Sequence, residues 1–422
     1  MEVVVYGHID GAVERVGTIK TLPAYEEQFT YAEPFMSAHP QSSLSLALPQ
    51  QEEPFAARQT RPFFKNLLPE GAALDAVARE LEVSSTSYLQ ILGKLGDECI
   101  GAVVIGGTGT LSPFDYSQIS RDELASFALR EADGMAQLQA ASRLSLAGAQ
   151  SKMGVLARFG DGGVEYLLPH GSAASTHILK TANRRFEQLS ENEHCCMRLA
   201  AACGIRVPRT YVDMVREGVP LFLVERYDRT VDSESGMVRR LHQEDFCQAL
   251  GLLPERKYER PGGSYLKSCA DLIVRYSTRP AEDMRQLIAL LAFNVMVGNC
   301  DAHLKNLSLL CDGSWSKRSL APAYDLASTV VYGGLDRHFS LRVGGSSKID
   351  DICRADFEKV ADEVSMSRKA VLAIVDDVVD TVILELPRVI EEIEEPLCKK
   401  LGKLRAIQEY SIRKSEDFSA VR

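Results

Sequence analysis

The segment Asp301-Ala-His-Leu-Lys-Asn306 holds the residues whose types and spacing are best suited to chemistry. An aspartate and an asparagine five residues apart match the catalytic loop of phosphoryl-transfer enzymes. In such a loop the carboxylate accepts the proton of an attacking hydroxyl, and the asparagine holds Mg²⁺ against the phosphates. A second carboxylate should bridge the metal, and Asp325 follows in Ala323-Tyr-Asp325. The spacing therefore predicts ATP- and Mg²⁺-dependent phosphoryl transfer.

The elements on either side of this segment help to decide whether the spacing marks a functional site or a chance pattern in a loop. Asp-x-x-x-x-Asn alone occurs by chance, because both residues are common in turns. Here an apolar helix ends at Gly298, and an apolar strand, Leu307–Leu310, follows directly. Burying a polar segment between two apolar elements costs several kcal/mol unless its groups are paired. The flanking elements and Asp325 together favour a site over a casual loop.

A phosphate-binding lysine should accompany this loop, and Lys180 ends the predicted strand His177–Lys180. The alternative is a lysine at a strand end that meets solvent. Glu193 is a candidate partner for this lysine. It could equally close a capping box, Ser190-x-x-Glu193, at a helix start. The sequence leaves both alternatives open.

Two further segments could contact a nucleotide. Residues 143–152 form a small-residue loop before a strand, and small side chains let backbone N–H groups approach phosphate oxygens. Glu225-Arg-Tyr-Asp228 follows an apolar strand, so its backbone could bind adenine while Tyr227 covers the base. A simple salt-bridged turn fits these four residues equally well. Gly106–Gly109 lacks the spacing of a phosphate loop and is interpreted as a linker.

The order of elements predicts an α+β fold. Short strands dominate the first half, including an alternating segment, Ser43–Leu48, and helices dominate the chain after residue 228. A strand-rich unit followed by a helical one suggests two lobes with a ligand cleft. We place boundaries after residues 108 and 228. They define an N-terminal subdomain (1–108), a nucleotide-binding N-lobe (109–228) and a helical C-lobe (229–422).

Composition narrows the class of protein. A net charge of −10 argues against a general nucleic-acid binder, because phosphate backbones reward a surplus of Lys and Arg. The N-terminus lacks the features of a signal peptide. The most apolar stretch, residues 370–386, contains four acidic residues, too many for a membrane span. Ten cysteines form no zinc-type Cys-x-x-Cys pair. We expect a cytoplasmic protein with no membrane partner.

Many short motifs follow one another over nearly the whole chain. They are Phe64-Lys-Asn-Leu-Leu-Pro-Glu70, Gly101-Ala-Val103, Ser145-Leu-Ala-Gly-Ala-Gln-Ser-Lys152, Thr176-His-Ile-Leu-Lys180, Asn192-Glu193, Val224-Glu-Arg-Tyr-Asp-Arg229, Gln243-Glu-Asp245, Tyr258-Glu259 with Gly262-Gly263, Asp301–Asn306 and Ala323-Tyr-Asp325. Together and in this order, they resemble the HipA family of bacterial toxin kinases. The resemblance implies a two-lobed, protein-kinase-like fold with an extra β-rich N-terminal subdomain and a helical C-terminal lobe.

The resemblance also implies a role for each candidate residue. Asp301 would be the catalytic base, Asn306 and Asp325 would hold Mg²⁺, and Ser145 would be autophosphorylated. The residues implied to contact ATP are Ala147, Gly148, Ala149, Gln150, Ser151, Lys152, Lys180, Glu225, Arg226, Tyr227, His303, Lys305 and Tyr324. Departures from ordinary kinases are Asp325-Leu-Ala in place of Asp-Phe-Gly and the absence of His-Arg-Asp.

In this family a HipB-like DNA-binding antitoxin binds the kinase, so DNA would be reached only through that partner. The protein substrate would be an aminoacyl-tRNA synthetase, with glutamyl-tRNA synthetase the leading candidate. Two alternatives remain. A small-molecule phosphotransferase of the aminoglycoside-kinase type uses a similar loop but needs no N-terminal β-unit. A catalytically silent co-repressor scaffold would need none of Lys180, Asp301, Asn306 and Asp325.

Overall fold

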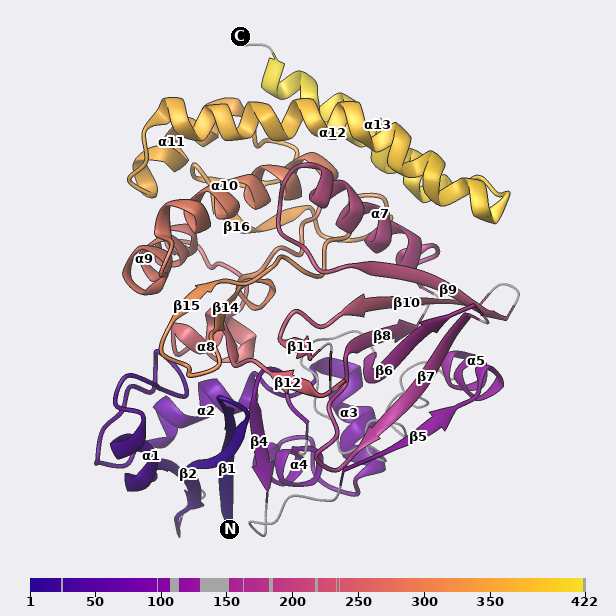
Figure 1. Cartoon of the computed structure of the whole chain (residues 1–422). Helices are drawn as coiled ribbons and strands as arrows, with labels where there is room; N and C mark the ends of the chain where they lie inside the picture. Colours follow the sequence, from indigo (N-terminus) through magenta and orange to yellow (C-terminus); the bar gives the residue numbers. More distant parts are fainter. Residues whose placement is uncertain are drawn as a thin grey trace. The chain divides into compact units, whose positions relative to one another are not determined.

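The structure, a computed structural model, describes residues 1–23, 26–96, 98–106, 114–129, 152–161, 163–181, 185–216, 219–232, 234 and 236–419. The chain packs into two compact units, and Figure 1 traces it from end to end. Unit 1 contains Met1–Ala182, Asp213–Glu255 and Ser308–Arg318, and unit 2 contains Asn183–Val212, Arg256–Leu307 and Ser319–Arg422. The division of the sequence at residues 108 and 228 stays a prediction.

A four-stranded antiparallel sheet opens unit 1, with strand order β3-β2-β1-β4. Side chains along β1 alternate between buried and half-buried, because one face of the sheet covers a core. Four helices follow β3, and Phe29, Phe35 and Phe64 lie in the core that they share with the sheet. The elements are β1 (Glu2–Ile9), β2 (Ala12–Thr21), β3 (Glu27–Tyr31), α1 (Glu33–Ala38), α2 (Ala57–Lys65), α3 (Gly71–Glu80), α4 (Tyr88–Leu95) and β4 (Val103–Gly106).

The same core takes in Trp315, which is distant in sequence. Its indole nitrogen donates a hydrogen bond to the carbonyl of His8 in β1, at 3.0 Å. A Cβ atom on Gly7 would collide with the indole ring. Glycine is therefore required at this position of β1, and the segment Ser308–Arg318 is tied to the N-terminal sheet.

The predicted strand over Ser43–Leu48 is wrong. The segment forms a turn, with one isolated bridge between Ser45 and Leu48. The Ser45 hydroxyl donates to the buried carboxylate of Glu244 at 2.6 Å, and the Leu46 N–H donates to the same group at 3.1 Å. A carboxylate from a remote segment satisfies donors that a ladder would otherwise use, so the alternating pattern does not produce a strand.

A six-stranded sheet forms much of the rest of unit 1, and its strand order is β5-β7-β6-β8-β10-β9. Its elements are β5 (Asp115–Ile119), α5 (Arg121–Leu129), β6 (Lys152–Gly160), β7 (Gly163–His170), β8 (His177–Thr181), β9 (Thr210–Arg216) and β10 (Val219–Glu225). Small elements follow: β11 (Arg229–Val231), β12 (Val238–Arg240), β13 (Gln243–Asp245), α8 (Phe246–Ala249), η2 (Pro254–Arg256), β14 (Ser308–Cys311) and β15 (Arg318–Leu320). The strands predicted at His177–Lys180 and Leu221–Val224 are confirmed as β8 and β10.

Unit 2 is mainly helical, and α10 is its buried centre. Long helix α12 packs on α10, α7, α11 and α13. The elements are α7 (Leu189–Ala202), α9 (Tyr265–Tyr276), α10 (Pro280–Val297), η3 (Leu304–Asn306), β16 (His338–Val343), β17 (Ser346–Lys348), α11 (Arg354–Glu363), α12 (Arg368–Leu397) and α13 (Gly402–Ser419). Strands concentrate in unit 1 and helices in unit 2, so the predicted α+β class is confirmed.

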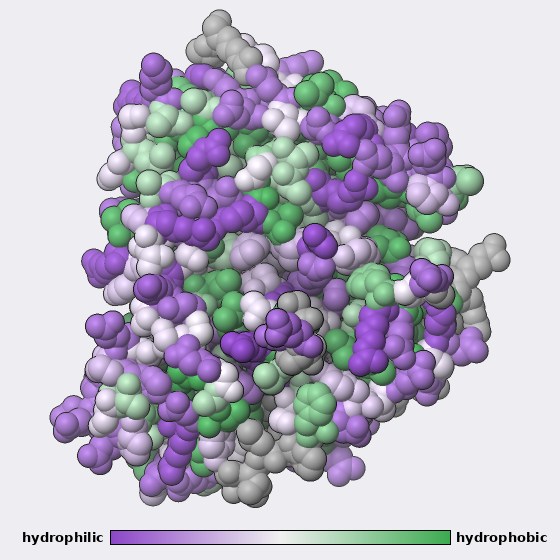
Figure 2. Space-filling model, in the orientation of Figure 1, coloured by the Kyte–Doolittle hydropathy of each residue, from purple (hydrophilic) through white to green (hydrophobic). Residues whose placement is uncertain are grey.

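On the face shown in Figure 2, hydrophilic residues are widely spread and hydrophobic ones occur between them. Among the described helices, none combines the length and the apolar character that crossing a membrane requires. The acidic residues within α12, which interrupt its apolar stretch, account for this result in the longest helix.

Candidate active site

The loop that carries Asp301 is fixed by the end of α10 in unit 2. Gly298 caps the helix in the left-handed conformation, with φ of 73°. Asn299 then donates to Asn294 Oδ1 at 2.9 Å, and the Asp301 N–H donates to Asn299 Oδ1 at 3.1 Å. The Cys300 N–H donates to the Thr329 hydroxyl at 2.9 Å. These bonds pair the polar groups that the apolar surroundings would otherwise penalise.

Asp301 keeps its carboxylate half-exposed while its backbone is held. The Asn306 side-chain amide donates to the Asp301 carbonyl at 2.8 Å, which closes the loop between residues five positions apart. The Tyr258 hydroxyl donates to Asp301 Oδ1 at 2.7 Å. His303 Nε2 lies 3.9 Å from the same oxygen, and the His303 side chain is buried. An accessible carboxylate on a rigid backbone suits a base that meets an incoming hydroxyl.

Asp325 approaches from a segment that is anchored in unit 2. The fully buried carboxylate of Asp283 accepts the Leu320 N–H at 2.7 Å, and the Arg206 carbonyl accepts the Ala323 N–H at 2.7 Å. Tyr324 donates its hydroxyl to the Lys305 carbonyl at 2.7 Å. Asp325 itself has φ of 56°, a left-handed conformation that is costly outside glycine and gathers at functional sites.

One cavity joins these residues. Asn299, His303, Asn306 and Asp325 line it, together with leucines from α10. The two predicted metal ligands, Asn306 and Asp325, therefore line the same cavity. Among the described residues, no three His, Cys, Asp or Glu side chains gather as a metal site. Mg²⁺ in phosphoryl transfer needs only one or two protein oxygens beside phosphates and water, so Asn306 and Asp325 fit it.

The candidate phosphate-binding lysine lies in unit 1. Lys180 in β8 stands directly opposite Lys152 in β6, and both residues are buried. Lys180 Nζ also lies 5.5 Å from the centre of the Phe222 ring in β10. The alternative of a solvated strand end is therefore wrong for Lys180. Opposite positions of antiparallel strands share a face, so two buried cationic side chains neighbour each other.

The segment Glu225–Asp228, at the end of β10, was predicted either to bind adenine or to form a salt-bridged turn. The Arg226 guanidinium is buried and ion-paired with Asp228 at 2.8 Å and with Glu98 at 3.3 Å. The salt-bridged turn predicted as one alternative therefore exists. Since its side chain is held there, Arg226 could meet a nucleotide only through its backbone. The Tyr227 hydroxyl donates to Gln243 Oε1.

The capping box predicted at Ser190 and Glu193 is wrong. Helix α7 starts at Leu189, two residues before the start that a Ser190 cap would give, and its N-cap is Gln188 in a left-handed conformation. Ser190 thus lies inside the first turn and cannot cap it. The Gln188 side-chain oxygen accepts the Lys403 N–H at 2.9 Å, which fixes the helix start by tertiary contact. Glu193 is buried in unit 2 and Lys180 lies in unit 1, and their pairing stays a prediction.

Some predicted residues lie outside the described part of the chain. They are Ser145, Ala147, Gly148, Ala149, Gln150 and Ser151. Other residues of the site were not predicted from the sequence. Tyr258 was identified only as part of a motif, and the contacts of Asp283 with Leu320 and of Glu98 with Arg226 span 37 and 128 residues, so no local pattern predicts them.

The fold matches that of a solved protein. Over 98% of its length the chain superposes on 97% of HipA from Shewanella oneidensis, solved with HipB and operator DNA, with a TM-score of 0.81 and 22% identity. Residues 8–106 match the HipA N-terminal domain, and residues 144–385 match the HipA-like C-terminal domain. This chain belongs to the HipA family.

Several sequence relatives are named as kinases. The candidate kinase Y4mE of Sinorhizobium fredii is 38% identical over 382 residues, which cover 86% of this chain and 87% of the relative. The serine/threonine-protein kinase toxin HipA of Shewanella oneidensis is 29% identical over 304 residues, 68% of this chain and 67% of the toxin. Membership in the family and the kinase fold predicted from the sequence motifs are confirmed.

Proposed function

We propose that this chain is an ATP- and Mg²⁺-dependent serine/threonine protein kinase, the toxin of a toxin–antitoxin pair. The observation that carries the proposal is a cavity lined by His303, Asn306 and Asp325, beside the Asp301 loop, in a chain of the HipA family. Oxygen donors suited to Mg²⁺ lie next to an accessible carboxylate, which phosphoryl transfer requires.

Asp301 is the proposed base. The acceptor hydroxyl forms a bond to the γ-phosphorus of ATP, and its proton passes to the Asp301 carboxylate. The bond between the γ-phosphorus and its bridging oxygen breaks, and ADP leaves. Asn306 and Asp325 are the proposed ligands of Mg²⁺, which neutralises charge on the phosphate oxygens when it is bound.

The remaining candidates divide by the part of ATP that they would bind. Lys152 and Lys180 suit the phosphates, because two buried cations on one face of a sheet favour a polyanion. His303, Lys305 and Tyr324 are proposed for the phosphate side of unit 2, and Glu225, Arg226 and Tyr227 for the adenine. The loop Ala147–Ser151 is proposed to cover the phosphates, and Ser145 to be the autophosphorylated serine.

The proposed partner is a HipB-like DNA-binding antitoxin. Support comes from the solved relative, which is in complex with HipB and operator DNA. The proposed protein substrate is an aminoacyl-tRNA synthetase, with glutamyl-tRNA synthetase the first to examine. The match of residues 8–106 to the HipA N-terminal domain favours this function over an aminoglycoside kinase.

The proposal is tested by incubating purified protein with Mg²⁺–ATP, alone and with a bacterial lysate, and locating phosphate by mass spectrometry. We expect phosphate on Ser145 and on a lysate protein. Asp301→Asn should lower the rate at least ~10³-fold, because the reaction depends on positioning and charge. Asp75→Asn, an exposed aspartate of α3, is the matched control and should keep the wild-type rate.

Absence of protein phosphate in every sample would overturn the proposed kinase. Asp301→Asn with a near-normal rate would instead assign the base to another residue. A phosphorylated small molecule with no phosphorylated protein would favour the small-molecule phosphotransferase.

A further inference from the structure

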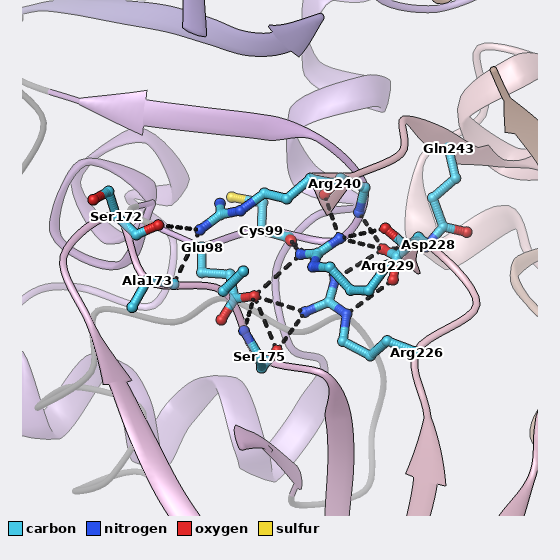
Figure 3. Close-up of polar contacts among 12 residues, drawn as sticks. Glu98, Cys99, Ser172, Ala173, Ser175, Arg226, Asp228, Arg229, Arg240 and Gln243 are labelled. Carbon is cyan, nitrogen blue, oxygen red and sulfur yellow. Dashed lines mark hydrogen bonds and ion pairs between the residues drawn. The ribbon is translucent and has the colours of Figure 1, made fainter. Parts of the chain in front are cut away.

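A buried cluster of charged residues joins the N-terminal sheet region to the segment after β10, entirely within unit 1. Figure 3 shows its side chains pointing toward one another. Its charged members are Glu98, Arg226, Asp228, Arg229 and Arg240, all buried. Removing charges from water is costly unless each is paired, so such a cluster is retained only where its geometry is closely fixed.

Glu98 is the residue that the N-terminal region contributes. Its Oε1 accepts the Ser175 N–H at 2.8 Å and the Ser175 hydroxyl at 2.9 Å. The same oxygen lies 3.3 Å from Arg226 Nη1 and 3.1 Å from Arg229 Nη2. One carboxylate oxygen therefore links strand-end residue Ser175, just before β8, to both arginines that flank Tyr227 and Asp228.

Asp228 closes the cluster from the other side. It accepts from Arg226 Nε at 2.9 Å and from the Gly101 N–H at 2.7 Å. Gln243 donates to it at 3.2 Å, and the same side chain accepts the Tyr227 hydroxyl. Gly101 has φ of 75°, and a Cβ there would come within 2.9 Å of the Gln243 N. The contact needs glycine, and the orientation of Tyr227 is set through Gln243.

Both carboxylates are held in the ionised form. Burial alone raises the pKa of Glu98, but Arg226 and Arg240 outweigh burial and the net shift is downward. The pKa of Asp228 is likewise raised by burial and lowered further by Arg226 and Arg229. A neutral residue in either place would leave buried guanidinium groups with too little opposing charge.

We propose that Glu98 is a positioning residue for nucleotide-base recognition: it fixes the backbone of Glu225–Tyr227 through Arg226 and Arg229. The inference rests on the proposed function, in which these residues meet adenine. Arg226 lies between Glu225 and Tyr227, so a shift of its guanidinium displaces both neighbours. Lys152 in β6 stands opposite Lys180 in β8, whereas Glu98 contacts the segment before β8, at Ser175. Loss of Glu98 should thus weaken contact with the base and spare contact with the phosphates.

The test measures Kd by calorimetry for Mg²⁺–ATP and for Mg²⁺–tripolyphosphate, which lacks the base. Glu98→Gln should raise Kd for ATP at least about fivefold and leave Kd for tripolyphosphate within about twofold. Ser175→Ala removes a hydroxyl that joins Glu98 to Arg226 at 3.0 Å and leaves every charge in place. It should raise Kd for ATP by a smaller factor. Glu33→Gln, an exposed glutamate of α1, is the control.

Thermal unfolding of each variant accompanies the binding data, and the Ser175→Ala result stands if Glu98→Gln does not fold. The inference is overturned if folded variants bind ATP as the wild type does, or if both ligands weaken in parallel. A wild-type chain that binds tripolyphosphate and ATP equally well would also overturn it. If the wild-type protein binds neither ATP nor tripolyphosphate, the proposed function is wrong, and so is the inference that rests on it.

Discussion

The Tyr258 phenol donates a hydrogen bond to Oδ1 of Asp301, with 2.7 Å between the two oxygens. Both residues belong to unit 2, and the tyrosine ring meets His303 edge-on at 5.2 Å between ring centres. In the proposed reaction an acceptor hydroxyl must donate to the same carboxylate. The phenol therefore occupies one of the acceptor positions of this carboxylate, and we predict that the acceptor hydroxyl competes with it for Oδ1.

Replacing Tyr258 by phenylalanine removes this competing donor and keeps the ring against His303. We expect KM for the protein acceptor to fall about two- to fivefold, the worth of one partly exposed hydrogen bond, with kcat nearly unchanged. Steady-state kinetics at saturating ATP measure both constants. A large loss of kcat with unchanged KM would mean that the phenol orients the base and does not compete with the acceptor.

Asp325→Asn should weaken the metal site and leave the fold intact. Asparagine tolerates the left-handed conformation that Asp325 adopts, at φ of 56°, so the backbone should not change. Loss of the carboxylate charge should raise the Mg²⁺ concentration for half-maximal activity at least about tenfold. Activity is measured across a Mg²⁺ titration, with Asp75→Asn as the control. An unchanged Mg²⁺ requirement would remove Asp325 from the metal site.

Gly298→Ala should destabilise unit 2 by two separable effects. The left-handed conformation costs a residue with a Cβ about 1–2 kcal/mol. The new methyl group would also collide with Val330 and approach Tyr410 within 3.0 Å, which adds about 1–3 kcal/mol. Urea unfolding measures the sum.

Gly334→Ala provides the matched control for this substitution. Gly334 has φ of 79° but open space where its Cβ would lie, so only the conformational cost applies. If both variants lose the same free energy of unfolding, the packing around Gly298 contributes nothing.

His242 should make the protein sensitive to acid. Burial lowers its pKa from 6.5 to about 3, and it stacks on Trp315 with 4.1 Å between ring centres. The unfolded state therefore binds a proton at His242 more readily than the folded state does. The folded state has its full stability from the neutral His242 above pH 6.5, and it loses this contribution as pH falls toward 3. His242→Gln should therefore reduce the loss of unfolding free energy between pH 7 and pH 5 by about 2 kcal/mol.

In His242→Gln the unfolding free energy should depend less steeply on pH, but the dependence should not vanish. Burial also lowers the pKa of His177 and His194 to about 4, so these two histidines destabilise the folded state at acid pH as His242 does. Unfolding in urea at a series of pH values measures the slope. An unchanged slope in the His242→Gln variant would contradict the prediction.

The sequence determined those features that depend on neighbouring residues. Alternating and continuous apolar runs predicted β8, β10 and α10, because strand and helix repeats are read directly from side-chain spacing. The same holds for the loop from Asp301 to Asn306, whose closure is a contact between residues five apart.

Tertiary structure decided whatever depends on a distant partner. Ser43–Leu48 has the pattern of a strand but turns, because Glu244 binds its donors. Helix α7 begins at Leu189 through a contact of Gln188 with Lys403, so its capping box does not form. Arg226 joins Glu98 across 128 residues, and Asp283 anchors the segment before Asp325. Local patterns fix what a residue can do, and only the folded chain supplies the buried, oppositely charged partner that decides what it does.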